Sequence, residues 1–384
     1  MKALISHRWP FPLVAALALV TPRGSRGEQT LAYKYADYRE ADGRVSVQTQ
    51  SALLSSDFGL AWHAKVTGTL DAITGATPTG QLAPAGSTQV PLSTLHDRRK
   101  AWTADLARQL PRVNLAVGFG NSRESDYVSN GWSLNAVTDF NQKNTTLLTG
   151  VAGTHDDVKV FFQSDRARKR TNDVIVGVTQ LLDRRTAVTF NVTWGRATGY
   201  MSDPYKLVQK DVEIIPDLFL TRTFRENRPG ARNKGIALLA LNRSYAELNG
   251  AVDATYRYYR DTFGTAAHTV DVAWLQRIGS QVIVSPGIRL YSQSAADFYY
   301  YNMNRTPITP VNTPREGTPH YSSDYRLSAM RTSNLALKLI WTPATWIKLD
   351  GAIEHYVMRG RDGVTPQSAY ARATTFTIGA TLTR

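Results

Sequence analysis

Apolar and polar residues alternate along segment after segment of this chain. Positions 188–194 read Val-Thr-Phe-Asn-Val-Thr-Trp, and positions 375–383 read Thr-Phe-Thr-Ile-Gly-Ala-Thr-Leu-Thr. Successive side chains of a strand point to opposite faces, so each such segment builds one apolar and one polar face. A helix would repeat its apolar residues every three to four positions instead. The pattern therefore predicts an all-β fold.

About 16 strands follow from this pattern. The predicted strands span roughly residues 30–40, 44–54, 57–70, 97–109, 112–124, 128–140, 144–155, 172–182, 186–198, 233–243, 247–261, 265–277, 281–297, 326–341, 346–359 and 370–384. An even number of antiparallel strands is typical of bacterial outer-membrane barrels. We expect a single transmembrane antiparallel β-barrel, located in the bacterial outer membrane.

The connections between these strands alternate in length. Tight connections are predicted at 55–56, 110–111, 141–143, 183–185, 242–246, 279–280 and 342–345. The long connections, at 71–96, 156–171, 199–232, 298–325 and 360–369, all fall between them. Outer-membrane barrels have short periplasmic turns and long outer loops. The alternation therefore places both ends of the barrel on the periplasmic side.

Bulky charged residues on the polar faces distinguish a barrel from a soluble β-sandwich, which also alternates but buries its apolar face. Six of them are predicted to line the lumen: Arg257, Arg289, Lys338, Lys348, Asp350 and Glu354. The four cations would favour anions, with Asp350 and Glu354 partly pairing them. Seven tryptophans near strand ends are typical of girdles at the lipid–water boundary.

Residues 1–27 resemble a signal peptide, with a basic start, a short apolar run and small residues before Glu28. The barrel would then occupy 28–384. The formal charge is +14, and the chain has no cysteine. The lack of cysteine excludes thiol nucleophiles and iron–sulfur clusters. No basic run interleaved with stacking aromatics points to nucleic acid, so the expected contact of this charge is membrane lipid.

Several segments resemble a known family. They are Leu-Asp-Ala-Ile-Thr-Gly-Ala-Thr-Pro at 70–78, Ser-Asp-Pro-Tyr-Lys at 202–206, Tyr-Arg-Tyr-Tyr-Arg-Asp-Thr-Phe-Gly at 256–264, and the stretch at 289–299. The chain resembles the outer-membrane β-barrel family of domain of unknown function 3570. The resemblance implies an outer-membrane barrel with no settled activity. It also implies a periplasmic or lipoprotein partner, linked to redox or flavin chemistry.

The sequence contains no pattern that identifies an enzyme or a cofactor. Neither His155 beside Asp156 and Asp157, nor His268, has a nucleophile placed near it by sequence. No metal-binding motif is present. The aromatic run Phe298, Tyr299, Tyr300 and Tyr301 is a candidate ligand surface at the outer end, or else part of a folded loop.

Two functions lead from the sequence, and a barrel hydrolase is the third. A barrel of about 16 strands encloses an aqueous lumen unless loops fill it. The first interpretation is therefore a porin-like channel for small polar or anionic solutes. The alternative is a loop-plugged barrel that anchors a periplasmic or surface partner.

Overall fold

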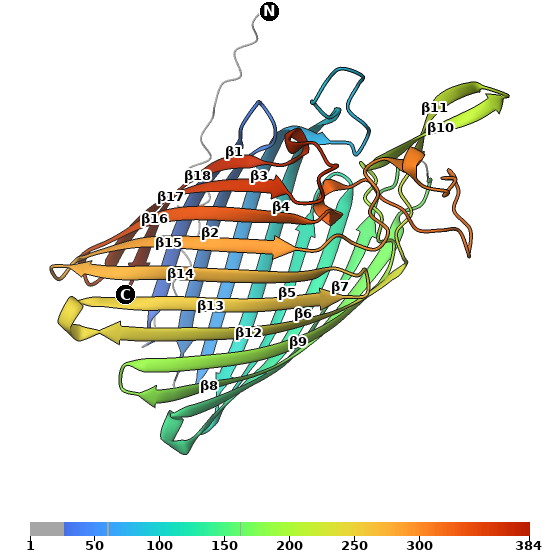
Figure 1. Ribbon diagram of the computed structural model, residues 1–384. Coiled ribbons are helices and arrows are strands. Elements are labelled where there is room, and N and C mark those ends of the chain that lie inside the picture. The colour runs from blue at the N-terminus through green and yellow to red at the C-terminus, as the bar shows by residue number, and fades with distance from the viewer. Residues whose placement is uncertain (1–26, 60, 162) are drawn as a thin grey trace, which may run out of the picture.

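The computed structural model describes residues 27–59, 61–161 and 163–384, and in these residues sixteen strands close one antiparallel barrel (Figure 1). The first eight are β1 (Gln29–Glu40), β2 (Ser46–Phe58), β3 (Trp62–Pro78), β4 (Leu92–Gln109), β5 (Val113–Arg123), β6 (Tyr127–Phe140), β7 (Thr145–Val158) and β8 (Ala167–Asp183). The others are β9 (Thr186–Gly199), β12 (Ala231–Tyr245), β13 (Gly250–Asp261), β14 (Ala266–Ile278), β15 (Val282–Gln293), β16 (Met330–Ala344), β17 (Ile347–Gly360) and β18 (Arg372–Thr383). The predicted fold class and strand number are confirmed.

The barrel closes where its first and last strands pair. β1 pairs with β2 on one side and with β18 on the other, from Thr30 opposite Thr383 to Glu40 opposite Ala373. The backbone N–H of Gln29 donates to the carbonyl of Arg384 at 2.9 Å, so both ends of the barrel sheet lie together. Closure leaves no unpaired sheet edge, as a barrel in lipid requires.

Seven connections at one end of the barrel are all tight, and all the long connections lie at the other end (Figure 1). The tight turns span 59–61, 110–112, 141–144, 184–185, 246–249, 279–281 and 345–346. The predicted turn at 55–56 is wrong, because β2 continues to Phe58 and the chain reverses after it. Gly59 has φ +58, a conformation that glycine adopts without strain, and this supports the reversal there.

A two-stranded sheet inside the long segment between β9 and β12 was not predicted. It pairs β10 (Leu207–Ile215) with β11 (Leu218–Arg225) and projects beyond the barrel (Figure 1). Asp217, with φ 65, lies in its two-residue turn. The strands β3 and β4 also run past their predicted ends, so the loop between them shrinks to 79–91.

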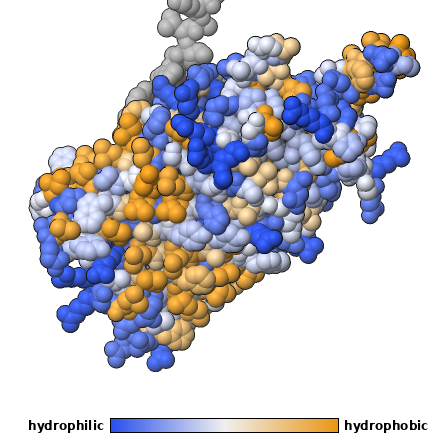
Figure 2. Space-filling view, viewed as in Figure 1, coloured by the Kyte–Doolittle hydropathy of each residue, from blue (hydrophilic) through white to orange (hydrophobic). Residues whose placement is uncertain are grey.

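The outer wall of the barrel carries the apolar face of the strands. Large apolar side chains are exposed there, including Trp102, Phe119, Trp194, Leu337 and Ile378. Figure 2 shows apolar residues as an orange area across the barrel wall that faces the viewer, with polar residues toward both ends. A belt of this kind is what hydrocarbon chains cover in an outer-membrane barrel.

The buried apolar clusters lie at the loop end rather than in the middle of the barrel. One joins Val90, Met330, Ala369 and Tyr370; a second joins Phe263, Ala296, Phe298 and Leu327; a third joins Val208, Met303 and Tyr321. The long loops are therefore folded and packed, and they are not loose connections.

No helix in the described part of the chain is long and apolar enough to cross a membrane. The predicted signal peptide falls almost entirely on residues 1–26, which lie outside the described residues.

Candidate functional site

All six charged residues predicted for the lumen lie on one face of the barrel sheet, opposite the apolar one. Along β17, Lys348, Asp350 and Glu354 alternate with Leu349 and Ile353. Arg289 lies opposite Asn334 of β16 in the register, and Lys338 lies opposite Ala352 of β17. Arg257, on β13, lies opposite Thr269. Because the apolar face forms the outer wall, this second face points inward.

Ion pairs on the inward face reach across an intervening strand. Lys34 of β1 meets Asp350 of β17 at 3.4 Å, above Gly379 of β18. A Cβ on Gly379 would come within 2.7 Å of the Asp350 carboxylate, so glycine leaves the room for this contact. Gly195 of β9 plays the same part between Lys234 and Asp173, which lie 3.0 Å apart.

The predicted partners of the two inward acids need correction. Asp350 pairs with Lys34, and Glu354 accepts a hydrogen bond from the side chain of Asn334 at 2.7 Å. Arg289 pairs with Asp271 at 2.6 Å. The strand alternation gives the face of each residue, but not which residue lies two strands away on a curved sheet.

Water reaches inward charges that lie away from the loop cap end of the barrel. The side chain of Arg289 is 60% exposed, and those of Lys65 and Asp105, which pair at 3.2 Å, are 42% and 37% exposed. These residues lie inside a closed ring of strands, so the solvent around them occupies the lumen. By contrast, inward groups nearer the loops, such as Asp71 and Gln293, are buried.

Three inward cations have no partner. Arg257, Lys338 and Lys348 make no ion pair with any acid in the described part of the chain; Lys348 is exposed, and Arg257 and Lys338 are partly exposed. The other inward lysines and arginines of the wall are mostly paired, as with Lys65 and Asp105. The inward face thus carries both ion pairs and these three cations without one.

Four segments fold together at the loop end, and we call residues 79–91, 200–230, 294–329 and 361–371 the loop cap. Lys206 donates through Nζ to the carbonyl of Pro78 at the end of β3, and Leu207 N–H donates to the Thr79 carbonyl at 2.8 Å. The segment that contains Lys206 follows β9, which is separated from β3 by five strands along the shorter way round. The cap therefore bridges the mouth between nearly opposite walls.

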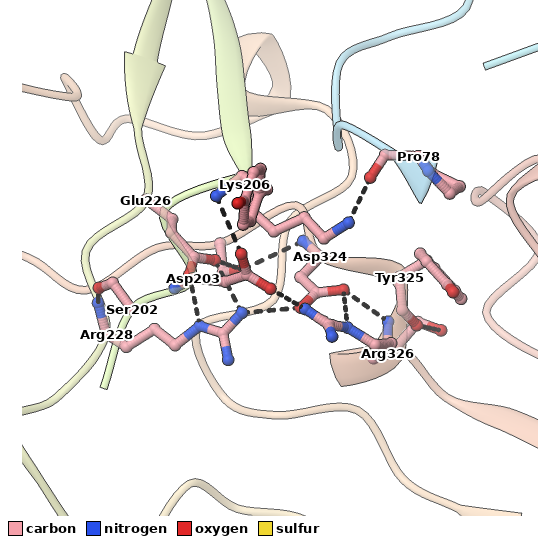
Figure 3. Close-up of polar contacts among 12 residues, drawn as sticks. Pro78, Ser202, Asp203, Lys206, Glu226, Arg228, Asp324, Tyr325 and Arg326 are labelled. Atoms are coloured by element: carbon pink, nitrogen blue, oxygen red, sulfur yellow. Dashed lines mark hydrogen bonds and ion pairs between the residues drawn. The ribbon is translucent and has the colours of Figure 1, made fainter. Parts of the chain in front are cut away.

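A buried ionic network holds the cap together (Figure 3). Arg228 contacts Glu226 at 2.8 Å and Asp324 at 2.7 Å, and Arg326 contacts the same Asp324 at 2.6 Å and also pairs with Asp203. The side chains of Glu226 and Asp324 are each only 1% exposed. Two arginines and three acids thus join the segment before β10, the segment after β11 and the loop before β16.

Burial and charge act in opposite directions on the acids of this network. Burial, reinforced by the negative charge of Asp324, raises the pKa of Glu226 to about 7, against the effect of Arg228. Asp324 is equally buried, but the guanidinium groups of Arg326 and Arg228 hold its pKa well below its usual range. Burial also lowers the pKa of Lys206. Asp324 is therefore the anionic centre on which the two arginines depend.

The aromatic run at 298–301 packs inside the loop cap. Phe298 meets Phe263 edge-on, with ring centroids 4.9 Å apart. The hydroxyls of Tyr299 and Thr365 are 2.5 Å apart, and Tyr301 accepts a hydrogen bond from the Ala83 backbone at 3.2 Å. Tyr300 packs against the third apolar cluster. These rings join loops to one another and do not form an open stacking surface.

Two other groups of side chains could take part in chemistry, a histidine–tyrosine pair and a group of three carboxylates. His268 Nδ1 lies 2.7 Å from the Tyr256 hydroxyl on the outer wall. The carboxylates of Asp97, Glu124 and Asp126 come within 4.8 Å of one another near the loop end. Hydrogen-bond donors of the protein already satisfy two of them, through Ser125 to Asp97 and Tyr205 to Asp126.

Sequence reasoning missed the ionic network. The contacts that tie it across the loops join distant positions: Arg228 and Asp324 are 96 apart in the chain, and Arg326 and Asp203 are 123 apart. The only signal was the segment at 202–206, which contains Asp203 and Lys206 and resembles the family named above.

The family model described as "Protein of unknown function (DUF3570)" matches residues 13–168 and 159–371. No curated protein matches the chain significantly.

Three similar solved structures are a bacterial polysaccharide outer membrane secretin, OprB of Pseudomonas putida and OccK5 (OpdH) of Pseudomonas aeruginosa. Their sequence identities are 9%, 7% and 8%, and their TM-scores are 0.48, 0.47 and 0.44. Each alignment covers 93% of this chain, and 97%, 93% and 98% of the respective other chain.

Proposed function

Because the chain belongs to the family described as "Protein of unknown function (DUF3570)" and folds into a closed barrel with an apolar outer wall, we propose that it is a channel of the bacterial outer membrane. It passes small polar or anionic solutes through a lumen that the loop cap narrows at its outer mouth. We propose passage rather than catalysis, since no nucleophile, base and acid come together among the described residues considered above.

The observation that supports a channel is the exposure of charged side chains inside the ring. Arg289, Lys65 and Asp105 lie on the inward face and remain in contact with solvent. A plugged barrel would cover such groups with loop residues along most of its length. Here the covered inward groups are those near the cap, such as Gln293, which donates to the carbonyl of Ser328 at 2.7 Å.

A modest preference for anions follows from the three unpartnered cations. Arg257, Lys338 and Lys348 present their charges to a lumen with low-dielectric walls, where their field is less screened than in bulk water. The acids Asp271 and Asp350 are engaged by Arg289 and Lys34, which limits their effect on passing ions.

We predict that the purified protein conducts ions in planar bilayers and that a salt gradient gives a reversal potential of anion sign. The double variant Arg257→Gln/Lys338→Gln should lose most of this preference, because it removes two of the three unpartnered charges. Arg331→Gln/Arg359→Gln removes the same charge from the outer wall and should leave selectivity unchanged. A correctly folded barrel that shows no conductance would reject the channel.

The loop cap favours one alternative, an anchor for a periplasmic or lipoprotein partner, including the redox-linked partner that the family resemblance implies. In that function the cap seals the mouth and the wall charges are structural. The same bilayer experiment separates the two functions, since an anchor conducts no ions with or without Arg257 and Lys338.

We also propose that the loop cap faces the outside of the cell and the tight turns face the periplasm. The chain has no cysteine, so single cysteines can report position. Ala85→Cys and Glu316→Cys, both at exposed cap positions, should react with an impermeant maleimide on intact cells. Arg184→Cys, in a tight turn, should react only after the outer membrane is opened. Labelling of Arg184→Cys on intact cells would reverse the orientation.

A further inference from the structure

A groove of about 720 Å³ lies on the outer wall near the loop end, over four neighbouring strands. We call it the outer groove. Its lining residues are His268, Val270, Leu290, Tyr291, Ser292, Arg331, Thr332, Ser333, Val357, Arg359 and Arg361. Most of them belong to the outward face of β14, β15, β16 and β17.

The strand register arranges these outward residues in two rows. The row nearer the loops reads His268, Ser292, Arg331 and Arg359, each opposite the next across a strand pair. The row nearer the turns reads Val270, Leu290, Ser333 and Val357 in the same way. The groove therefore has a polar, basic edge directly beside an apolar one.

The apolar row continues into the wall that faces hydrocarbon. The next outward row toward the turns contains Val272, Ile288 and Leu335, all of them exposed. The outer groove thus lies at the upper border of the apolar belt, where the headgroups of the outer leaflet meet the acyl chains.

The basic edge of the groove is not neutralised by the protein. In residues 27–59, 61–161 and 163–384, no carboxylate pairs with Arg331, Arg359 or Arg361, and no acidic residue lines the groove. Arg361 reaches from the cap onto β15, where Nη1 donates to Ser292 Oγ at 2.7 Å. Three guanidinium groups therefore line one recess of the outer wall, and their positive charge is not neutralised by a carboxylate of the described residues.

Other outward positions near the loop end repeat this charge around the barrel. They include Lys100 beside Arg123, Arg170 on β8, Arg196 on β9 and Arg260 on β13. Part of the basic charge of the chain thus lies on the outer wall, where contact with membrane lipid is expected. The outer groove is the place where this charge meets a recess.

We propose that the outer groove binds the phosphorylated headgroup of an anionic membrane lipid, with an acyl chain along Val270, Leu290 and Val357. Arginine binds phosphate oxygens through two parallel hydrogen bonds, and basic pockets at a membrane surface select anionic headgroups. A soluble phosphate would use only the basic row, and the adjoining apolar row gives a lipid the additional contact. This site does not depend on whether the lumen conducts.

The test uses the full-length protein in a neutral detergent, with native mass spectrometry of bound lipid. The probes are lipid A with its phosphates, the same lipid after dephosphorylation, and inorganic phosphate. The variant Arg331→Gln/Arg359→Gln/Arg361→Gln should bind phosphorylated lipid A on the order of 100-fold more weakly, since each arginine contributes about fivefold. The control Arg112→Gln/Lys143→Gln/Arg184→Gln removes equal charge from the tight turns and should bind like the unmodified protein.

Each outcome decides the proposal. Preference for phosphorylated over dephosphorylated lipid A, lost in the groove variant alone, supports it. Equal binding by the groove variant and the control overturns it, and so does inorganic phosphate that competes as well as the lipid. Gel mobility of unheated samples checks that the barrel is folded. If the triple variant does not fold, Arg331→Gln and Arg359→Gln separately should each weaken binding about fivefold.

Discussion

Replacing Ile378 with arginine should lower the free energy of unfolding by about 2–4 kcal/mol, the cost of an arginine on the lipid face near the bilayer midplane. Ile378 lies in the middle of β18, between Tyr35 of β1 and Gly351 of β17. Its side chain is among the most exposed apolar groups of the outer wall, at 63%. The hydrocarbon around it offers no partner for a guanidinium group, so the charge must be desolvated or must distort the bilayer.

The neighbouring residue provides the matched control. Thr377 points inward, and its partners across the strands are the small residues Ala36 and Ala352. An arginine at Thr377 therefore enters a watery lumen with room beside it, and the variant should lose far less stability than Ile378→Arg. Urea titrations of the protein folded into lipid vesicles measure both values. Equal losses would show that both faces of β18 are buried in protein, contrary to a lipid-facing wall.

Strand number and order could be predicted because lipid outside and water inside impose one alternation on the whole barrel. The first turn could not be located in this way. Ser55 and Asp57 are polar, as turn residues often are, but they are also inward positions of β2, opposite Lys65 and His63 of β3. Polar residues that face the lumen and polar residues in a turn look alike in sequence. The alternation therefore could not show that the chain reverses near Gly59 and not at 55–56.

The alternation of apolar and polar residues could not predict the loop cap, for a different reason. Its contacts join residues far apart in the chain, such as Lys206 and Pro78, which are 128 positions apart. No repeat in the sequence records such a pairing. The hairpin β10–β11 was missed because the long segments were expected to connect strands and not to form them. The position of the positive charge could not be predicted either, because composition gives the net charge of +14 but not the face of the barrel on which the charged residues lie.

The second large loss of stability is expected when an acid of the ionic network in the loop cap is replaced. Asp324→Asn removes the negative charge that Arg228 and Arg326 share at 2.7 and 2.6 Å, and leaves the two guanidinium groups facing each other. Breaking one partner of a buried ion pair costs about 3–5 kcal/mol. The lower end of that range applies here, because Arg326 is half exposed and water can screen it.

The cost should appear as opening of the cap rather than unfolding of the barrel, since the strand ladder does not include Asp324. We expect protease to cut within 200–230 and 294–329 on the order of 100-fold faster, which corresponds to the lower end of that free energy. Single-channel conductance should rise in the same variant because the segments that bridge the mouth separate.

Asp217→Asn, at the exposed turn of the β10–β11 hairpin, removes the same charge without a buried partner and should change neither measurement. If Asp324→Asn resists protease like the unmodified protein, the network does not hold the cap. If the cap opens without a rise in conductance, the cap is not what narrows the mouth.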